Sequence, residues 1–101
     1  MSSFSTHVLD TALGKPAAGV PVTLSRADGS VLASGTTDGD GRWRAPEAAA
    51  LTAGVVHRIT FETGTSFFPE VSIAFRPETT DRHHHVPLLL SPYSYSTYLG
   101  S

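Results

Sequence analysis

Apolar and polar residues alternate along most of this chain, which is the pattern of β-strands that bury one face. Every second residue suits a core in 55–61 and again in 71–75. Asp28-Gly29 supplies the positive φ that a tight hairpin turn needs. The segments predicted to form strands are 5–11, 20–26, 31–37, 42–45, 55–63, 69–76, 83–91 and 93–99.

One stretch, residues 46–54, favours a helix instead. Pro46 suits the first helical position, and Glu47 suits the positive end of the helix dipole. Three alanines follow, and Gly54 ends the stretch. Ala45 is a poor N-cap, so the helix should have only a few turns. Eight strands and one short helix predict an all-β sandwich that forms a single domain over residues 1–101.

Composition narrows the classes of function. Seven Lys and Arg against nine Asp and Glu give a net charge of −2, which argues against nucleic acid or an anionic membrane as partner. The longest apolar run, 86–90, is far too short to span a membrane. The chain has no cysteine for disulfides or thiol chemistry. The first ten residues lack the features of a secretory signal, so we expect a cytoplasmic protein.

Histidine offers the clearest candidate chemistry. Strand alternation puts His83 and His85 on one face and His84 on the other. A metal site on His83 and His85 lacks a cysteine or a carboxylate at matching spacing, so we expect no metal. The sequence DGDG at 38–41 lacks most ligands of a calcium loop and predicts a turn. By these patterns alone, His7 is ambiguous and the function of the domain stays open.

Three motifs, in this order, resemble the 5-hydroxyisourate hydrolases, the transthyretin-like enzymes of purine catabolism. They are THVLDTALGKPAAGVPV at 6–22, TTDGDGR at 36–42 and HHVPLLLSPYSYSTYLGS at 84–101. The resemblance covers nearly the whole chain. It implies two four-stranded sheets packed face to face, with the short helix between the fifth and sixth strands. It also implies a homotetramer with a central channel and active sites where two dimers meet.

The implied reaction is hydrolysis of 5-hydroxyisourate, a small purine-derived substrate, to 2-oxo-4-hydroxy-4-carboxy-5-ureidoimidazoline. The resemblance implies no metal and no organic cofactor. A base must activate water, and a guanidinium suits the planar anionic substrate. His57 and His83 match no role in the family, and His84 is expected to be structural or solvated. The residues that match the family site are His7, His85 and Ser101 for catalysis and Arg42, Tyr98, Leu99 and Gly100 for substrate binding.

Leu99 departs from the family, whose chains end in Tyr-Arg-Gly-Ser. Leucine removes a fixed charge and five hydrogen-bond donors. If the arginine stabilises the transition state, its loss would cost about 2–4 kcal/mol. Three origins of Leu99 are then open. It is a natural variant with weakened activity, an engineered substitution, or a natural change for which another cation compensates. Arg44, which has the same strand parity as Arg42, is a candidate for that cation.

Two other classes of function stay open. One is a transthyretin-like carrier that binds a small aromatic ligand in the central channel. The other is a β-sandwich adhesion module, in which His7, Arg42 and His85 would not converge. Convergence of these three side chains on one cleft therefore favours the hydrolase.

Overall fold

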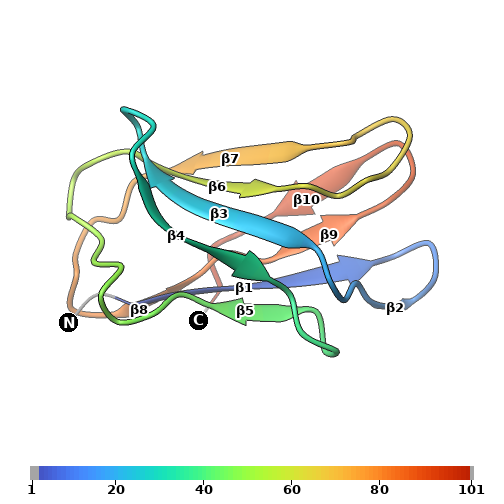
Figure 1. Cartoon of the computed structure of the whole chain (residues 1–101), viewed down its shortest axis with the longest axis horizontal. Coiled ribbons are helices and arrows are strands. Elements are labelled where there is room, and N and C mark those ends of the chain that lie inside the picture. The colour runs from blue at the N-terminus through green and yellow to red at the C-terminus, as the bar shows by residue number, and fades with distance from the viewer. Residues whose placement is uncertain (1–2, 101) are drawn as a thin grey trace.

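Two β-sheets pack face to face in the computed structural model, which describes residues 3–100 (Figure 1). One sheet has the strand order β4-β3-β6-β7. The other has β1 at its centre, with β8 and β9 along one side, β2 and β5 along the opposite side, and β10 outside β9. The strands are β1 (Ser3–Asp10), β2 (Lys15–Pro16), β3 (Pro21–Arg26), β4 (Val31–Thr36), β5 (Arg42–Arg44), β6 (His57–Phe61), β7 (Val71–Phe75), β8 (His83–His85), β9 (Leu88–Leu90) and β10 (Tyr95–Thr97).

The expected hairpin at Asp28-Gly29 is confirmed. It joins β3 to β4, and Gly29 takes a φ of 90°. The Asp28 carboxylate accepts a hydrogen bond from the Ser30 backbone N–H at 2.9 Å, which closes the turn. The alternation across β6 is confirmed too, because its first, third and fifth residues are buried.

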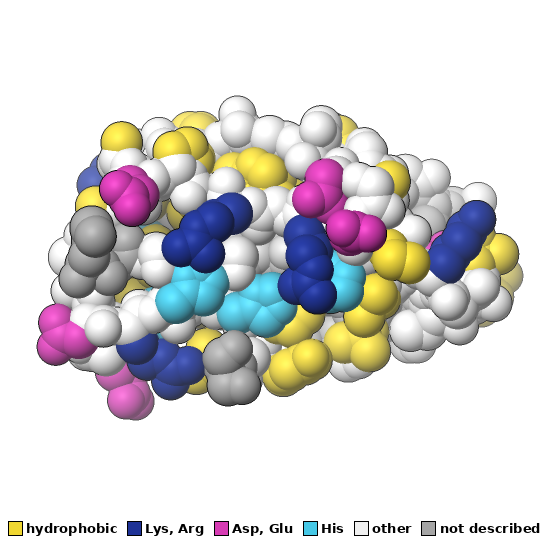
Figure 2. Space-filling view, turned by 90° about the horizontal axis from the view of Figure 1, so that it is seen from below, with side chains coloured by type: hydrophobic (Ala, Val, Ile, Leu, Met, Phe, Trp, Pro, Cys, Tyr) yellow, Lys and Arg dark blue, Asp and Glu magenta, His cyan; other side chains and the backbone are white. Residues whose placement is uncertain are grey.

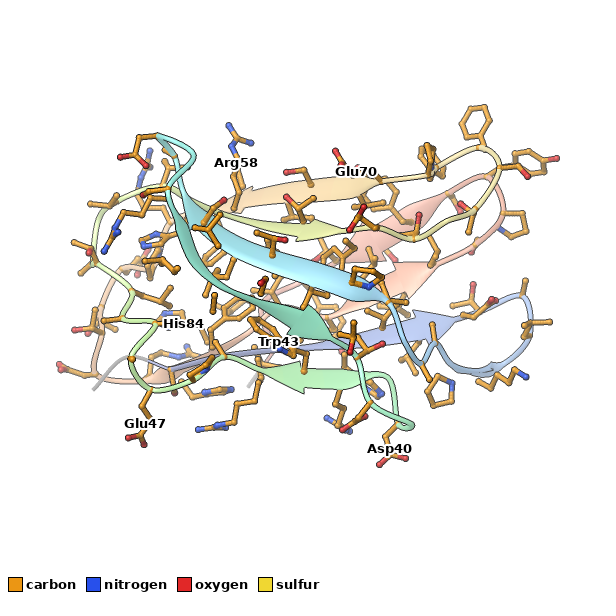
Figure 3. The ribbon with its side chains drawn as sticks, viewed as in Figure 1. Asp40, Trp43, Glu47, Arg58, Glu70 and His84 are labelled. Carbon is orange, nitrogen blue, oxygen red and sulfur yellow. The ribbon has the colours of Figure 1, made fainter. Side chains whose placement is uncertain are left out.

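The core lies between the sheets and is built from the inward residues of both. Burying each large side chain stabilises the fold by about 1.5–3 kcal/mol. Trp43 also points inward, between the sheets (Figure 3), and its ring lies 6.4 Å from that of Phe4. The largest fully buried apolar side chains are Phe4, Val8 and Leu88 from the first layer and Val22, Leu24, Ile59, Phe61 and Val71 from the second.

The structure divides the single strand expected at 83–91 into β8 and β9. Pro87 has no N–H to donate, so it interrupts the ladder beside β1. Thr6 Oγ1 donates to the Val86 carbonyl, and Thr97 Oγ1 donates to the Pro87 carbonyl at 2.8 Å. This division and the two-residue strand β2 bring the described strands to ten, so one sheet has six strands instead of four.

The helix expected over 46–54 is wrong. The segment forms turns, in which the Ala49 N–H donates to the Pro46 carbonyl at 2.9 Å, a three-residue spacing. The Ala45 N–H donates to the Phe4 carbonyl and so extends the pairing of β5 with β1 by one residue. Nine residues are too few for stable helix by propensity alone, and burial of Ala49 and Leu51 fixes the turns instead. Within residues 3–100, no helix is long and apolar enough to cross a membrane.

Candidate functional site

Alternate residues of β1 face away from the core and begin the candidate site. Phe4, Thr6 and Val8 are fully buried between the sheets. Ser5 and His7 therefore project from the outer face of the six-stranded sheet, where both are half-buried.

The strands beside β1 add charged side chains to this outer face. Arg42 of β5 lies directly opposite His7, and Arg44 lies opposite Ser5. On the other side of β1, His85 of β8 also lies opposite Ser5. Figure 2 shows histidine side chains next to basic side chains on this face. Three separate segments of the sequence thus place His7, Arg42 and His85 on one outer face.

The DGDG turn holds the His7 imidazole. The Asp38 carboxylate accepts hydrogen bonds from the N–H groups of Asp40 and Arg42, at 2.9 and 3.0 Å. Both hydrogen bonds lower the pKa of the Asp38 carboxyl group, and the bond from the Arg42 N–H has the larger effect. His7 Nε2 lies 2.8 Å from the Asp40 carbonyl, which can only accept, so Nε2 carries the proton. In the uncharged form of the ring the lone pair is therefore on Nδ1.

Serine hydroxyls link the outward histidines of β8. Ser5 Oγ lies 2.6 Å from His83 Nε2 and 2.8 Å from His85 Nδ1. Ser3 Oγ forms a further hydrogen bond with His83 Nδ1. Ser5 and His83 are not among the residues that the sequence predicts for the site. Strand alternation puts Ser5 on the same face as His7, and His83 on the same face as His85. The hydrogen bonds between Ser5 and the two histidines could not be predicted, because they join residues about 80 apart in the chain.

The environment lowers the pKa of both outward imidazoles and so favours their neutral forms. Burial lowers the pKa of His85, and the positive charges of Arg42 and His7 lower it further. Burial, followed by the charge of Arg44, lowers the pKa of His83. A neutral imidazole can accept a proton from water, so His85 is suited to act as a base near neutral pH.

A shallow hollow opens beside these groups. Its volume is about 240 Å³, and Arg42, Arg44 and His85 line it together with Ser5. The two guanidinium groups offer hydrogen-bond donors to a small planar anion.

The end of the chain packs against His85. The Gly100 N–H donates to the His85 carbonyl at 2.7 Å, and Arg82 Nη2 donates to the Gly100 carbonyl at 3.2 Å. A Cβ on Gly100 would lie 2.7 Å from His85 Cδ2, so only glycine fits here without a shift. Ser101, predicted to be catalytic, lies outside the described residues.

Tyr98 and Leu99 line a different cavity from Arg42 and His85. They are 58% and 60% exposed and line a cavity of about 410 Å³ between β7 and β10. Arg76 and Arg82 line the same cavity, whereas Arg44 lines the hollow with Arg42. The cations that share a cavity with Leu99 are therefore Arg76 and Arg82, and Arg44 is not among them.

The other histidines face the interior. His84 is buried, and its Nδ1 has no hydrogen-bond partner among the described residues. His57 is fully buried, donates from Nδ1 to the Val55 carbonyl at 2.7 Å and accepts the Thr52 N–H at Nε2. His57 is thus a hydrogen-bonded core residue. Residues 3–100 contain no group of three or more His, Cys, Asp or Glu that could hold a metal ion.

Comparison with known proteins identifies the family. The HIUase/Transthyretin family model matches residues 4–100. The chain belongs to this family. It is 45% identical to the 5-hydroxyisourate hydrolase of Caulobacter vibrioides over the full length of both chains. The structure of Klebsiella pneumoniae 5-hydroxyisourate hydrolase is similar over all of both chains, with 40% identity and a TM-score of 0.87. Sea bream transthyretin in complex with thyroxine is also similar, with 28% identity, a TM-score of 0.79 and coverage of 96% and 93% of the two chains.

Proposed function

We propose that this chain hydrolyses 5-hydroxyisourate to 2-oxo-4-hydroxy-4-carboxy-5-ureidoimidazoline. The observation that carries the proposal is the hollow lined by Arg42 and His85, with His7 opposite Arg42 on the same outer face and the pKa of His85 lowered by burial. The relatives named 5-hydroxyisourate hydrolase support the same activity.

In the proposed reaction, a neutral imidazole accepts a proton from water. The water oxygen then forms a bond to a ring carbonyl carbon of the substrate, and negative charge develops on the carbonyl oxygen. Arg42 and Arg44 lie where they would hold the planar anion and stabilise this charge. The carbon–nitrogen bond of the cyclic amide breaks, the nitrogen takes up a proton, and the products are a carboxylate and a ureido group. Water is the only co-reactant.

The test follows the ultraviolet absorbance of freshly generated 5-hydroxyisourate with the natural chain, Leu99→Arg and Arg42→Ala. We expect the natural chain to speed the decay and Arg42→Ala to lower kcat/KM about 10²- to 10³-fold, as for loss of a transition-state donor. Arg58→Ala is the matched control, because Arg58 is exposed on β6 of the other sheet (Figure 3). If neither the natural chain nor Leu99→Arg exceeds the buffer rate, the proposal fails. If only Leu99→Arg speeds the decay of 5-hydroxyisourate, then Leu99 is the residue that lowers the activity of this chain.

The carrier alternative has one observation in its favour, the exposed Leu99 beside a largely apolar cavity. A carrier of an aromatic ligand does not, however, require neutral histidines next to an arginine. Equilibrium dialysis with a small aromatic ligand separates the two functions. Tight binding by a chain that leaves 5-hydroxyisourate unchanged would favour the carrier.

We further propose that the chain assembles as a homotetramer. In the described part of the chain, β7 and β10 each pair with a single strand, so each has an unpaired edge. Tyr98 and Leu99 add exposed apolar surface next to these edges. Light scattering should then give four times the 10.7 kDa mass of one chain. A cytoplasmic location remains a prediction from the sequence.

A further inference from the structure

We propose that Arg44 is a further catalytic residue, whose guanidinium binds the carbonyl oxygen at which negative charge develops and then the carboxylate that hydrolysis leaves behind. This inference rests on the proposed hydrolase function. It separates the tasks of the two arginines that line the hollow, and it gives Arg44 a role that does not depend on the cavity beside Leu99.

Arg44, Ser5 and His85 form one row across three neighbouring strands. Ser5 of β1 lies opposite Arg44 of β5 on one side and opposite His85 of β8 on the other. Neighbouring strands are about 4.8 Å apart, so the Cα atoms of Arg44 and His85 are about 10 Å apart. Ser5, which lies between them, has a small side chain, and its Oγ is 2.8 Å from His85 Nδ1. All three residues line the hollow of about 240 Å³, so a guanidinium and an imidazole flank the place where a substrate would lie.

Arg42 belongs to the next row, where a carboxylate offsets part of its charge. It lies opposite His7, whose Nε2 is 2.8 Å from the Asp40 carbonyl. Two backbone hydrogen bonds lower the pKa of Asp38 most, and the positive charge of Arg42 lowers it further. Asp38 also lines the hollow, so an anion bound to Arg42 is repelled by this carboxylate.

The charges that act beside Arg44 are positive instead. Arg44 is exposed on the outer face. Burial first, and then the charge of Arg44, lowers the pKa of His83, and the other charges that act on His83 come from basic side chains too. An anion next to Arg44 is therefore attracted by its whole surroundings, and Arg44 is better suited than Arg42 to receive a new negative charge.

Hydrolysis creates such a charge. Water gives one proton to the His85 imidazole, its oxygen forms a bond to the ring carbonyl carbon, and the carbonyl oxygen becomes an anion. When the carbon–nitrogen bond breaks, the nitrogen takes the proton from the imidazolium. The new carboxyl group then releases its own proton to solvent near neutral pH, so the product has one more negative charge than the substrate. A guanidinium on the far side of Ser5 from the base can bind this oxygen before and after the bond breaks.

The kinetic test compares Arg44→Gln, which removes the charge, with Arg44→Lys, which keeps it. We expect Arg44→Gln to lower kcat for 5-hydroxyisourate about ten- to a hundredfold with KM nearly unchanged, because the charge develops only after the substrate is bound. Arg44→Lys should recover most of the lost kcat but not all of it, since lysine lacks the planar fork of donors. The melting temperature should not change, because Arg44 is exposed. Arg58→Ala, an exposed change in the other sheet, is the control (Figure 3).

Two planar probes test Arg44 without turnover. Imidazole-4-carboxylate has a carboxylate on a planar ring, and imidazole-4-carboxamide is its neutral counterpart. Titrations followed by amide chemical shifts should show that the natural chain binds the carboxylate more tightly than the carboxamide. Arg44→Gln should reduce this preference about tenfold, whereas Arg42→Ala should keep a preference for the carboxylate.

Three results would overturn the proposal. They are full kcat in Arg44→Gln, a raised KM with unchanged kcat in Arg44→Gln, and a preference for the carboxylate that Arg44→Gln leaves unchanged. Absence of hydrolysis by the natural chain would instead count against the proposed function, because the two probes report on Arg44 whether or not the chain turns over 5-hydroxyisourate.

Discussion

Single residues decide how closely the end of the chain approaches the candidate base. Gly100 is buried, and its N–H and its missing Cβ both face His85. Arg82 holds the same residue from its carbonyl side at 3.2 Å. The position of His85 therefore depends on a glycine outside the histidine triplet.

Gly100→Ala tests this contact. The new Cβ would lie 2.7 Å from His85 Cδ2, so the imidazole or the chain end must move. A displacement near 1 Å at a reacting group costs about 10²-fold, and we expect kcat/KM to fall by that order while the melting temperature changes little. Ser94→Ala, an exposed change in the preceding turn, is the control. Full activity in Gly100→Ala would show that the chain end moves freely.

At this scale the sequence predicts part of the site. Motif order places His7, Arg42 and His85 in one site, and strand alternation alone puts His83 and His85 on the same face. The hydrogen bonds of Ser5 are beyond such reasoning, because they depend on a parallel register between residues about 80 apart in the chain. Leu99 and Arg42 line different cavities. Which cavity Leu99 lines depends on the side of β8 along which the end of the chain runs, and the alternation of apolar and polar residues does not predict that side.

Among the elements, the DGDG turn adds to what the strands place in the site. The DGDG turn orients both His7 and Arg42, and its backbone depends on Gly41. Gly41 has a φ of 75°, and a Cβ there would lie 2.4 Å from the Val8 carbonyl. The Gly41 carbonyl also accepts the Val8 N–H at 2.7 Å.

Gly41→Ala should therefore destabilise the fold and weaken the site together. A left-handed conformation costs a residue with a Cβ about 1–2 kcal/mol, and displacing the turn adds the loss of the Val8 hydrogen bond, about 1 kcal/mol more. We expect the free energy of unfolding to fall by about 2–3 kcal/mol in urea titration. Gly39→Ala, in the same turn, is the matched control, because a Cβ at Gly39 meets nothing within 4 Å. Equal stability of the two variants would contradict this account of the turn.

Sequence reasoning predicts strands better than it predicts the segments between them. Alternation in β6 and β7 needs only one buried face, and the structure confirms both strands. Residues 46–54 show the limit, since alanine propensity favours a helix while burial of Ala49 and Leu51 selects turns. The break at Pro87 is tolerated only because the hydroxyls of Thr6 and Thr97, distant in sequence, satisfy the freed carbonyls.

For the whole molecule, the histidine triplet links stability to pH. The pKa values of His83, His84 and His85 are all lowered from an ordinary value of 6.5, in each case mainly by burial. Below that pH the unfolded chain binds protons that the folded chain does not bind at these sites. The groups that face the three rings are Arg42 and Arg44 from β5, His7 from β1, His57 from β6 and Arg82 beside β8.

The fold should therefore lose stability on acidification well before its carboxylates titrate. As the pH falls from about 8 to about 5, the unfolded state gains protons on the triplet first, so the urea midpoint should decrease, most steeply below 6.5. Asp28 and Asp38 do not contribute in this window, because their pKa values lie below 3.8. His84→Phe removes one of the three groups, so its midpoint should depend less on pH than that of the natural chain. A midpoint that is constant over this range, or an equal slope in His84→Phe, would show that the triplet does not control acid stability.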